Sequence, residues 1–401
     1  MAATAVGSGF GRLWVSSLLS NLSDGIRAAA FPLLAVTLTR DPMLVAGVTV
    51  AQQVPWLIAG PLAGVMVDRA DRRRILWVVN TVRASIFALL AVAVVSGESP
   101  LWLLYLAAVA LGVGESFYDN AAQTVVPVLI ESTELERANG RLVAAEVAGN
   151  EIVGPPIGAM LFSVAVVLPF ASSAAGLVVA VVLVLGLAGS FRPATIATDS
   201  SDGMWRQLTE GFRFVRRDRE LATVTLLAGV LYAADAAWFA ILVLYSLEVL
   251  DLSEAAFGAL LAVGAVGGII GAVSASKLAS RFRLGTLLAG ILLVSAVAQL
   301  VLGTTSNAAL AILFIAVSSF PFGVWSVVAV SLRQRVTPSH LLGRANATYH
   351  AVSVGAAPIG AILGALAAEQ WGIRAPFLIG VPALLAGALL AARRLRGNSN
   401  L

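Results

Sequence analysis

The chain alternates long apolar stretches with short polar segments. Twelve apolar stretches can be distinguished, each of roughly 20 residues or more, the length that spans a bilayer as a helix. They lie at 12–38, 43–67, 75–96, 101–127, 138–165, 169–190, 221–247, 255–276, 284–304, 308–332, 344–368 and 374–392. Lipid leaves backbone groups no hydrogen-bond partner outside the helix itself. The pattern therefore predicts an all-α membrane protein with twelve transmembrane helices.

One long polar segment, residues 191–220, divides the pattern almost in half. It mixes linker residues with a short amphipathic piece whose Trp205, Leu208 and Phe212 could lie at the membrane interface. We therefore expect an N-terminal six-helix bundle at 1–190, a cytoplasmic central loop at 191–220 and a C-terminal six-helix bundle at 221–401.

The two halves also repeat sequence landmarks. Gly60 and Gly64 recur as Gly267 and Gly271, and Arg-Ala-Asn at 137–139 recurs at 344–346, each at an offset of 207 residues. "PIGAML" at 156–161 matches "PIGAIL" at 358–363 at an offset of 202, so the register slips by five residues in between. Landmarks at one offset indicate a duplicated six-helix unit.

Composition agrees with a membrane protein and narrows its chemistry. The chain is 59% hydrophobic and 12% charged, with a mean hydropathy of +0.91. It contains no cysteine and two histidines, His340 and His350, so we expect no metal centre and no cofactor. The net charge of +4 comes from basic residues scattered over short loops, which does not suggest nucleic-acid binding. No phosphate-binding GxxxxGK[ST] loop is present, and no clustered nucleophile suggests an enzyme.

The basic residues predict the orientation. With both termini on one side, the segments on that side contain 21 arginines and lysines, whereas the opposite loops contain Arg40 and Arg374. Arg27, Arg83 and Arg141 remain within predicted spans. The positive-inside rule then places both termini in the cytoplasm.

The turn after the second span carries the densest charge of the chain. "VMVDRADRRRILW" places six charged residues within seven positions, 68–74. Positive charge in a short cytoplasmic turn sets the topology, but this does not explain the acids or the preceding "GPLAG". The stretch resembles the loop signature of the major facilitator superfamily, matched here by Gly64, Asp68, Arg69, Arg72 and Arg73. Asp71 stands where that signature usually has glycine.

The resemblance covers the whole chain and carries expectations for the fold and mechanism. It implies two pseudo-symmetric six-helix bundles, a bacterial plasma-membrane location and transport by alternating access. The signature residues are implied to form a cytoplasmic gate, a latch that is closed in one state and released in the other. In the second half, Ala275 stands opposite Asp68, so we expect the latch acid only in the first half.

Other motifs resemble an exporter branch of this superfamily. In "ANGRLVAAEVAGNEIVGPPIGA", residues Gly154, Pro155 and Gly158 match a fifth-helix signature of antiporters, with Asn150 where that pattern has glycine. "SNLSDG" in the first span and "GESFYDNAAQ" in the fourth look like multidrug and siderophore exporters, including enterobactin exporters. Ala108 stands where many proton-driven relatives have arginine.

Charged residues inside the spans are the candidates for proton coupling. Such a group costs about 2.5–3.5 kcal/mol at a helix centre, so it usually faces a cavity or a partner. The candidates are Asp24, Arg27, Glu115, Asp119, Glu146, Glu151 and Asp235. A low-dielectric cavity favours the neutral form of an acid and makes it a proton carrier. Two pairs share a helix face, Asp24 with Arg27 and Glu115 with Asp119.

Structural explanations remain open for the same residues. Asp24 and Arg27 could form an intrahelical pair, Glu151 could bond backbone amides freed by the following proline, and Arg141 could snorkel to the interface. Asn346 and His350 could join a proton path or be satisfied polar groups. The hypothesis that unites the pattern is a monomeric proton antiporter that exports a small amphipathic molecule. A proton-coupled importer is the alternative, and a membrane receptor or enzyme ranks below both.

Overall fold

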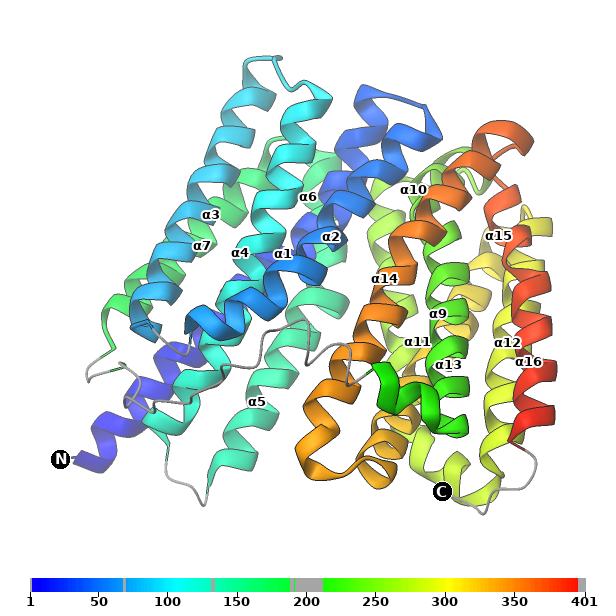
Figure 1. Ribbon diagram of the computed structural model, residues 1–401. Helices are drawn as coiled ribbons and strands as arrows, with labels where there is room; N and C mark the ends of the chain where they lie inside the picture. Colours follow the sequence, from blue (N-terminus) through cyan, green and yellow to red (C-terminus); the bar gives the residue numbers. More distant parts are fainter. Residues whose placement is uncertain (1, 68–69, 131–133, 188–190, 192–211, 396–401) are drawn as a thin grey trace. The chain divides into compact units, whose positions relative to one another are not determined.

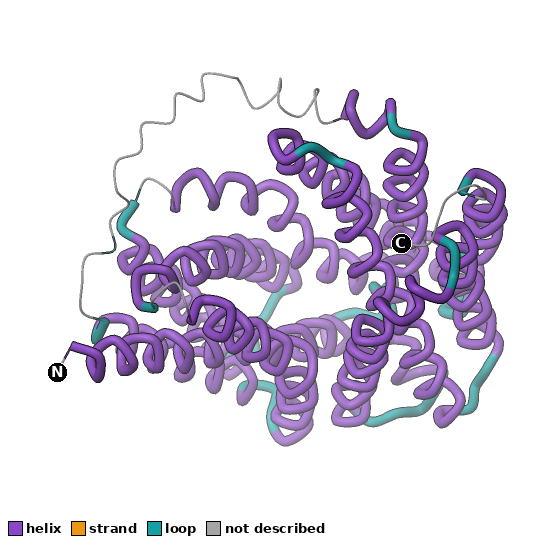
Figure 2. The backbone as a smooth tube through the Cα atoms, turned by 90° about the horizontal axis from the view of Figure 1, so that it is seen from below, coloured by secondary structure: helices purple, strands orange, loops and turns teal. Residues whose placement is uncertain are grey.

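The computed structural model describes residues 2–67, 70–130, 134–187, 191 and 212–395 (Figure 1). The described chain is built of helices, with no strand among its elements (Figure 2). Helices occur at all twelve predicted positions, so the prediction of an all-α membrane protein is confirmed. Within the described residues, nine helices are long and apolar enough to cross a membrane by themselves. The remaining predicted spans correspond to α1, α2 and the series α5, η2 and α6.

The chain folds into two compact units. Unit 1 comprises Met1–Arg40, Val48–Ala197 and Ser253–Ala262, and unit 2 comprises Asp41–Gly47, Thr198–Leu252 and Val263–Leu401. The predicted boundary at 191–220 stays a prediction, because most of that segment lies outside the described residues.

Unit 1 is arranged around its first helix. The helices of the first half are α1 (Ala2–Leu38), α2 (Pro42–Val67), α3 (Arg72–Val95), α4 (Leu101–Leu129), α5 (Leu135–Val147), the π-helix η2 (Ala148–Val153), α6 (Gly154–Val164) and α7 (Leu168–Leu185). α1 contacts α4, α5, η2, α6 and α7, while α3 packs between α4 and α7 (Figure 1). Polar residues of α1 are therefore surrounded by protein rather than lipid.

Unit 2 depends on close helix crossings. The helices of the second half are α9 (Arg219–Phe239), α10 (Leu242–Leu244), the π-helix η3 (Tyr245–Val249), α11 (Glu254–Arg281), α12 (Leu284–Thr304), α13 (Ala308–Val336), α14 (Ser339–Trp371), α15 (Ala375–Ile379) and α16 (Val381–Arg394). Gly267 and Gly271 of α11 lie against the backbone of α13, and Gly360 and Gly364 lie against that of α9. Small residues allow this approach, which gives the repeated glycines of α11 a packing role.

Three predicted spans are interrupted rather than continuous. The fifth changes to a π-helix at η2, the seventh breaks after Phe239 before α10 and η3, and the twelfth divides at Gly380 between α15 and α16. Apolar periodicity cannot reveal these breaks, because each segment remains apolar on both sides of the change. Large apolar side chains such as Val95, Val164 and Val273 are exposed on the helices, as expected for surfaces that face lipid.

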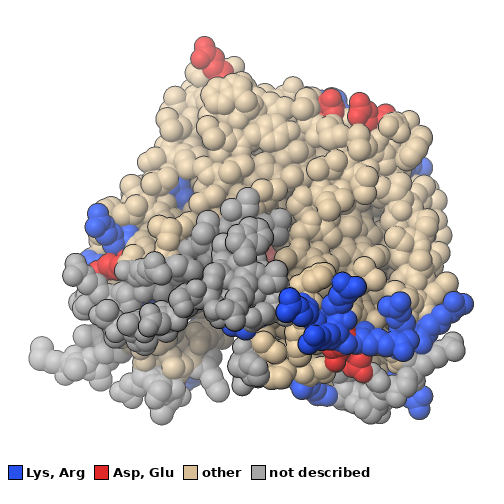
Figure 3. All heavy atoms as spheres, viewed as in Figure 1, with Lys and Arg blue, Asp and Glu red and all other residues tan. Residues whose placement is uncertain are grey.

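Charge is segregated within unit 2. Basic residues lie at one end of its helices, at the start of α9 and α12 and in the last turns of α11, α13 and α16. Figure 3 shows a dense group of Lys and Arg side chains at this end. This is the distribution that the positive-inside rule associates with the cytoplasmic face.

Candidate functional site: a buried ion-pair network in unit 1

The polar residues of α1 line up along the part of the helix that other helices cover. Ser16, Ser20, Asp24 and Arg27 recur at spacings of four or three residues, Asn21 lies next to Ser20, and all five are buried. This spacing places them on adjoining faces of one helix. The stretch "SNLSDGIR" lowers the apolar character of this span. Its polar side chains lie in the interior of unit 1.

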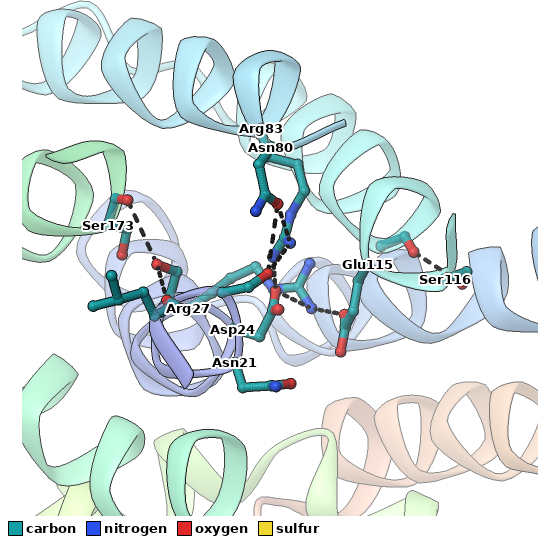
Figure 4. A network of polar contacts seen from close by, with 12 residues as sticks. Asn21, Asp24, Arg27, Asn80, Arg83, Glu115, Ser116 and Ser173 are labelled. Atoms are coloured by element: carbon teal, nitrogen blue, oxygen red, sulfur yellow. Dashed lines mark hydrogen bonds and ion pairs between the residues drawn. The ribbon is translucent and has the colours of Figure 1, made fainter. Parts of the chain in front are cut away.

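Four charged side chains from three helices form a network at this position (Figure 4). Arg83 of α3 pairs with Asp24 of α1 at 2.5 Å between Nη2 and Oδ1, and Arg27 pairs with Glu115 of α4 at 2.5 Å between Nη2 and Oε2. A longer contact of 3.7 Å joins Arg27 to Asp24. The exposed fractions are 1% for Arg83, 4% for Asp24, 6% for Arg27 and 7% for Glu115, so solvent screens none of these charges appreciably.

The network corrects the geometry expected for the pair Asp24 and Arg27. The two side chains do share a helix face, yet each has its shorter ion pair with another helix. With all four groups ionised the charges cancel, two negative against two positive. Arg27 Nε and Nη1 are buried and make no hydrogen bond with the described residues. The network is thus electrically balanced but retains unused donors.

Arg83 is the functional candidate that the sequence reasoning missed. It was noted only as an arginine within a span, although the cost of burying a charge applies to it as much as to the acids. In the structure it is the most buried member of the network, and Nη1 also donates to Ser20 Oγ at 2.7 Å and to Asn80 Oδ1 at 3.2 Å. The sequence does contain a signal for this role, because Arg83 lies in the middle of an apolar stretch of membrane-spanning length.

Other predicted acids lie beside this network. Asp119, one turn along α4 from Glu115, is partly buried and interacts electrostatically with Glu115, Glu146 and Arg83. Its neighbour Tyr118 is fully buried and contacts Ser16 Oγ at 3.0 Å through its hydroxyl. Glu115 forms its ion pair with Arg27, and a proton shared between Glu115 and Asp119 remains a prediction.

The fifth-helix motif packs closely against α1. A Cβ atom on Gly158 would lie 2.5 Å from the carbonyl oxygen of Ile26, and one on Gly154 would lie 2.6 Å from the Cα of Gly25. Pro155 is buried and occupies the first turn of α6, where its missing N–H leaves no helix bond unmade. These residues bring α6 against the same helix that carries Asp24 and Arg27.

The π-helix η2 contains two further candidates. Asn150 is partly buried, with an unpaired Oδ1, and Glu151 is exposed. The backbone of η2 packs on α1 beside Asn21, where a Cβ on Gly149 would meet the Asn21 Cβ at 3.0 Å. π-helical turns are rare and often mark functional positions.

η2 also accounts for part of the slip between the two halves. The distance from Arg-Ala-Asn to Pro-Ile-Gly is five residues longer in the first half, and α14 crosses the equivalent stretch without a π-turn. Five residues exceed one α-helical turn by about 1.4 residues, which would rotate the following face by about 140°. A π-turn absorbs about one extra residue and reduces that rotation to about 40°.

Part of the loop signature can be placed. Asp68 and Arg69 lie outside the described residues, as does the environment of Gly64. Arg72 Nη1 donates to the carbonyl of Thr124 near the end of α4, at 3.1 Å, and Arg73 donates to Val184 and Leu185 at the end of α7. Cations at helix C-termini satisfy free carbonyls and oppose the helix dipole.

Asp71, the departure from the loop signature, has a local role. Its carboxylate caps α3 by accepting from the backbone N–H of Arg74 at 3.2 Å. An aspartate is a preferred N-cap residue, whereas glycine has no side chain to accept this bond. The acid thus fixes the start of the helix that carries Arg83.

Asp235 belongs to unit 2, where it is partly buried in α9. Asn346 and His350 also lie in unit 2, but Asn346 accepts a hydrogen bond from Arg333, and the His350 ring is exposed and packs edge-on against Tyr349. Their proposed part in a proton path stays a prediction.

The fold, together with a family model that matches residues 5–398, places the chain in a class of protein, the membrane transporters of the major facilitator superfamily. Solved structures agree: a mutant of the nucleoside transporter NupG superposes with a TM-score of 0.80 over 96% of this chain and 99% of that chain, at 12% identity. A bacterial homologue of the iron transporter ferroportin in its inward-facing state gives 0.72 over 96% and 98%, at 16% identity. At these identities the likeness concerns the fold alone.

Sequence relatives place the chain more closely. A family model described as transmembrane secretion effector matches residues 5–398, so the chain belongs to this family of the superfamily. The multidrug efflux pump Tap of Mycolicibacterium fortuitum is 28% identical over 392 residues, covering 93% of each chain. The enterobactin exporter EntS of Shigella boydii serotype 4 is 26% identical over 390 residues, covering 95% of this chain and 90% of the relative.

Proposed function

We propose that the protein exports a small amphipathic molecule in exchange for protons, by alternating access across a bacterial plasma membrane with both termini in the cytoplasm. Export is supported by the relatives, which are named as an efflux pump and as siderophore exporters. Orientation is supported by the basic end of unit 2. The observation that carries proton coupling is the buried network of Asp24, Arg27, Arg83 and Glu115.

The network links protonation to helix contacts. When Glu115 takes a proton, Arg27 loses its charged partner and the four groups acquire a net positive charge. An uncompensated charge in a low-dielectric interior is costly, so the α1–α4 contact differs in free energy between the two protonation states. A structural change that depends on such a difference is what couples a proton to alternating access.

Asp119 and Glu146 supply the second part of the proposal. Both are partly buried, and neither has an ion-pair partner among the described residues. Their spacing from Glu115 suits a chain of proton carriers along α4 and α5. The same unpaired acids favour cationic or neutral lipophilic substrates, whereas the unused donors of Arg27 suit an anionic siderophore.

A gradient-discharge experiment tests this function. In inverted membrane vesicles, a transported compound from a panel of lipophilic cations and siderophores is expected to discharge an imposed proton gradient. Asp119→Asn is expected to reduce this discharge to background, because a neutral amide cannot carry the proton while the ion pairs remain intact. Discharge is followed with a pH-sensitive dye.

The matched control is Glu98→Gln, which removes an exposed acid from the turn between α3 and α4. It is expected to leave discharge unchanged. Normal pH-dependent transport by Asp119→Asn would contradict the proton role of this residue. Accumulation of a compound in the opposite direction would favour the importer.

A further inference from the structure

A second buried arginine in a different part of the molecule is unlike those of the network. Arg333 lies in the last turn of α13 in unit 2 and is 4% exposed. No carboxylate pairs with it among the described residues, and the ring it stacks on is that of Tyr349. A buried charge without a counter-charge is unfavourable and seldom retained without a partner.

Neighbouring side chains hold this guanidinium in a fixed orientation. Its Nε donates to Asn346 Oδ1 at 2.8 Å, and its Cζ lies 3.7 Å from the centroid of the Tyr349 ring. The Tyr349 hydroxyl in turn accepts from Trp325 Nε1 at 2.9 Å. The Tyr349 ring covers one face of the guanidinium, and the hydrogen bond to Asn346 uses Nε. Of the terminal nitrogens, Nη1 is buried without a hydrogen-bond partner in the described structure.

The helix end alone does not account for this arrangement. A cation in the last turn of α13 opposes the helix dipole, but the exposed Arg335 in the same turn does so without being buried. Arg333 instead donates to a side chain of α14, and no hydrogen bond joins it to a described carbonyl at the end of α13. The geometry suits an oxyanion receptor, because neighbouring side chains hold the guanidinium and its Nη1 has no hydrogen-bond partner among the described residues.

We propose that Arg333, oriented by Asn346 and Tyr349, binds an oxyanion of the phosphate type. Figure 3 shows other basic side chains at this end of unit 2. Arg335 in the last turn of α13 and the exposed Lys277 near the end of α11 raise the local concentration of anions. The partly buried Asn346 and the exposed His350 connect the cluster to the surface. The same chemistry is supplied by the headgroup of an anionic phospholipid and by free phosphate. The described contacts of Arg333 involve none of the four charged residues of the network in unit 1.

Thermal unfolding of the full-length protein distinguishes the two sources. One arm compares sodium phosphate with sodium chloride at equal ionic strength in detergent. The other compares nanodiscs of phosphatidylcholine alone with nanodiscs that also contain phosphatidylglycerol. We expect at least one addition to raise the unfolding midpoint of the wild type. Phosphate alone identifies a soluble oxyanion, and phosphatidylglycerol alone identifies the lipid headgroup.

Two variants assign the effect to the proposed site. Arg333→Gln is expected to weaken the apparent affinity about tenfold or more, the loss of one charge-assisted fork. Arg335→Gln removes an exposed charge from the same turn and is expected to weaken the apparent affinity much less than Arg333→Gln does, because Arg335 only raises the local concentration of anions. If Arg333→Gln does not fold, Asn346→Ala replaces it and is expected to respond less, because the guanidinium is no longer held. No midpoint shift in the wild type, or an undiminished shift in the variant, overturns the proposal.

Discussion

Replacing Arg83 with methionine is expected to lower the free energy of unfolding by about 3–5 kcal/mol, because the change leaves Asp24 buried without its counter-charge. Nη1 of Arg83 also holds Ser20 and Asn80, whose polar atoms would lose a donor. A loss of this size is a large fraction of the stability of most proteins. The loss in the free energy of unfolding is measured by reversible unfolding in mixed micelles. The yield of folded protein from membranes provides a second measure.

A double variant distinguishes the net contribution of the ion pair from the cost of leaving one of its charges buried alone. Asp24→Asn combined with Arg83→Met removes both charges, so most of the stability lost in Arg83→Met is expected to return. Arg74→Met, at an exposed position of the same helix, is expected to change stability by no more than about 0.5 kcal/mol. A double variant as unstable as the single one would show that the pair is not the source of the loss.

The second large effect is expected at the crossing of α1 and α6. Gly158→Ala places a methyl group 2.5 Å from the Ile26 carbonyl oxygen and 2.8 Å from its Cα, both backbone atoms that cannot rotate away. The helices must separate, at a cost of about 1–3 kcal/mol. The separation also displaces Asp24 and Arg27, so proton-coupled transport is expected to fall more than the amount of folded protein does.

Gly140→Ala in α5 provides a control of opposite sign. No atom lies within 4 Å of the Cβ that this change would add. Alanine has the higher helix propensity, so a gain of about 0.5–1 kcal/mol is expected. Unfolding midpoints of the two variants, measured side by side with transport rates in vesicles, check both. Equal midpoints would mean that the crossing of α1 and α6 tolerates a side chain.

The sequence placed the transmembrane segments well because the signal is local. Twenty apolar residues span a membrane wherever they occur, and the positions of α3, α4, α7 and α12 follow from the hydropathy of each segment alone. The π-helix η2 could not be predicted in this way. Gly149 and Gly154, in and just after η2, pack on α1, and this contact joins two segments more than 100 residues apart in the chain.

The candidate site was predicted in part for the same reason. The free-energy cost of a charged group inside a transmembrane helix identified Asp24, Arg27 and Glu115 as candidates, each from its own position in the sequence. The pairing between these side chains depends instead on which helices are in contact. Helical spacing suggested Asp24 with Arg27, because i,i+3 neighbours can be found without knowing the fold. The shorter ion pairs to Arg83 and Glu115 cross between helices.

The sequence by itself thus determined that this protein is an α-helical membrane protein with charged residues inside its spans, and it predicted a duplicated six-helix plan. Only the tertiary structure decided that Asp24 pairs with Arg83, that Arg27 pairs with Glu115, and that Arg333 is buried without a carboxylate among the described residues. The physical reason is range. Hydropathy and helical periodicity act over one turn to one span of the chain, while the free energy of a buried charge depends on side chains that only helix packing brings within a few ångströms.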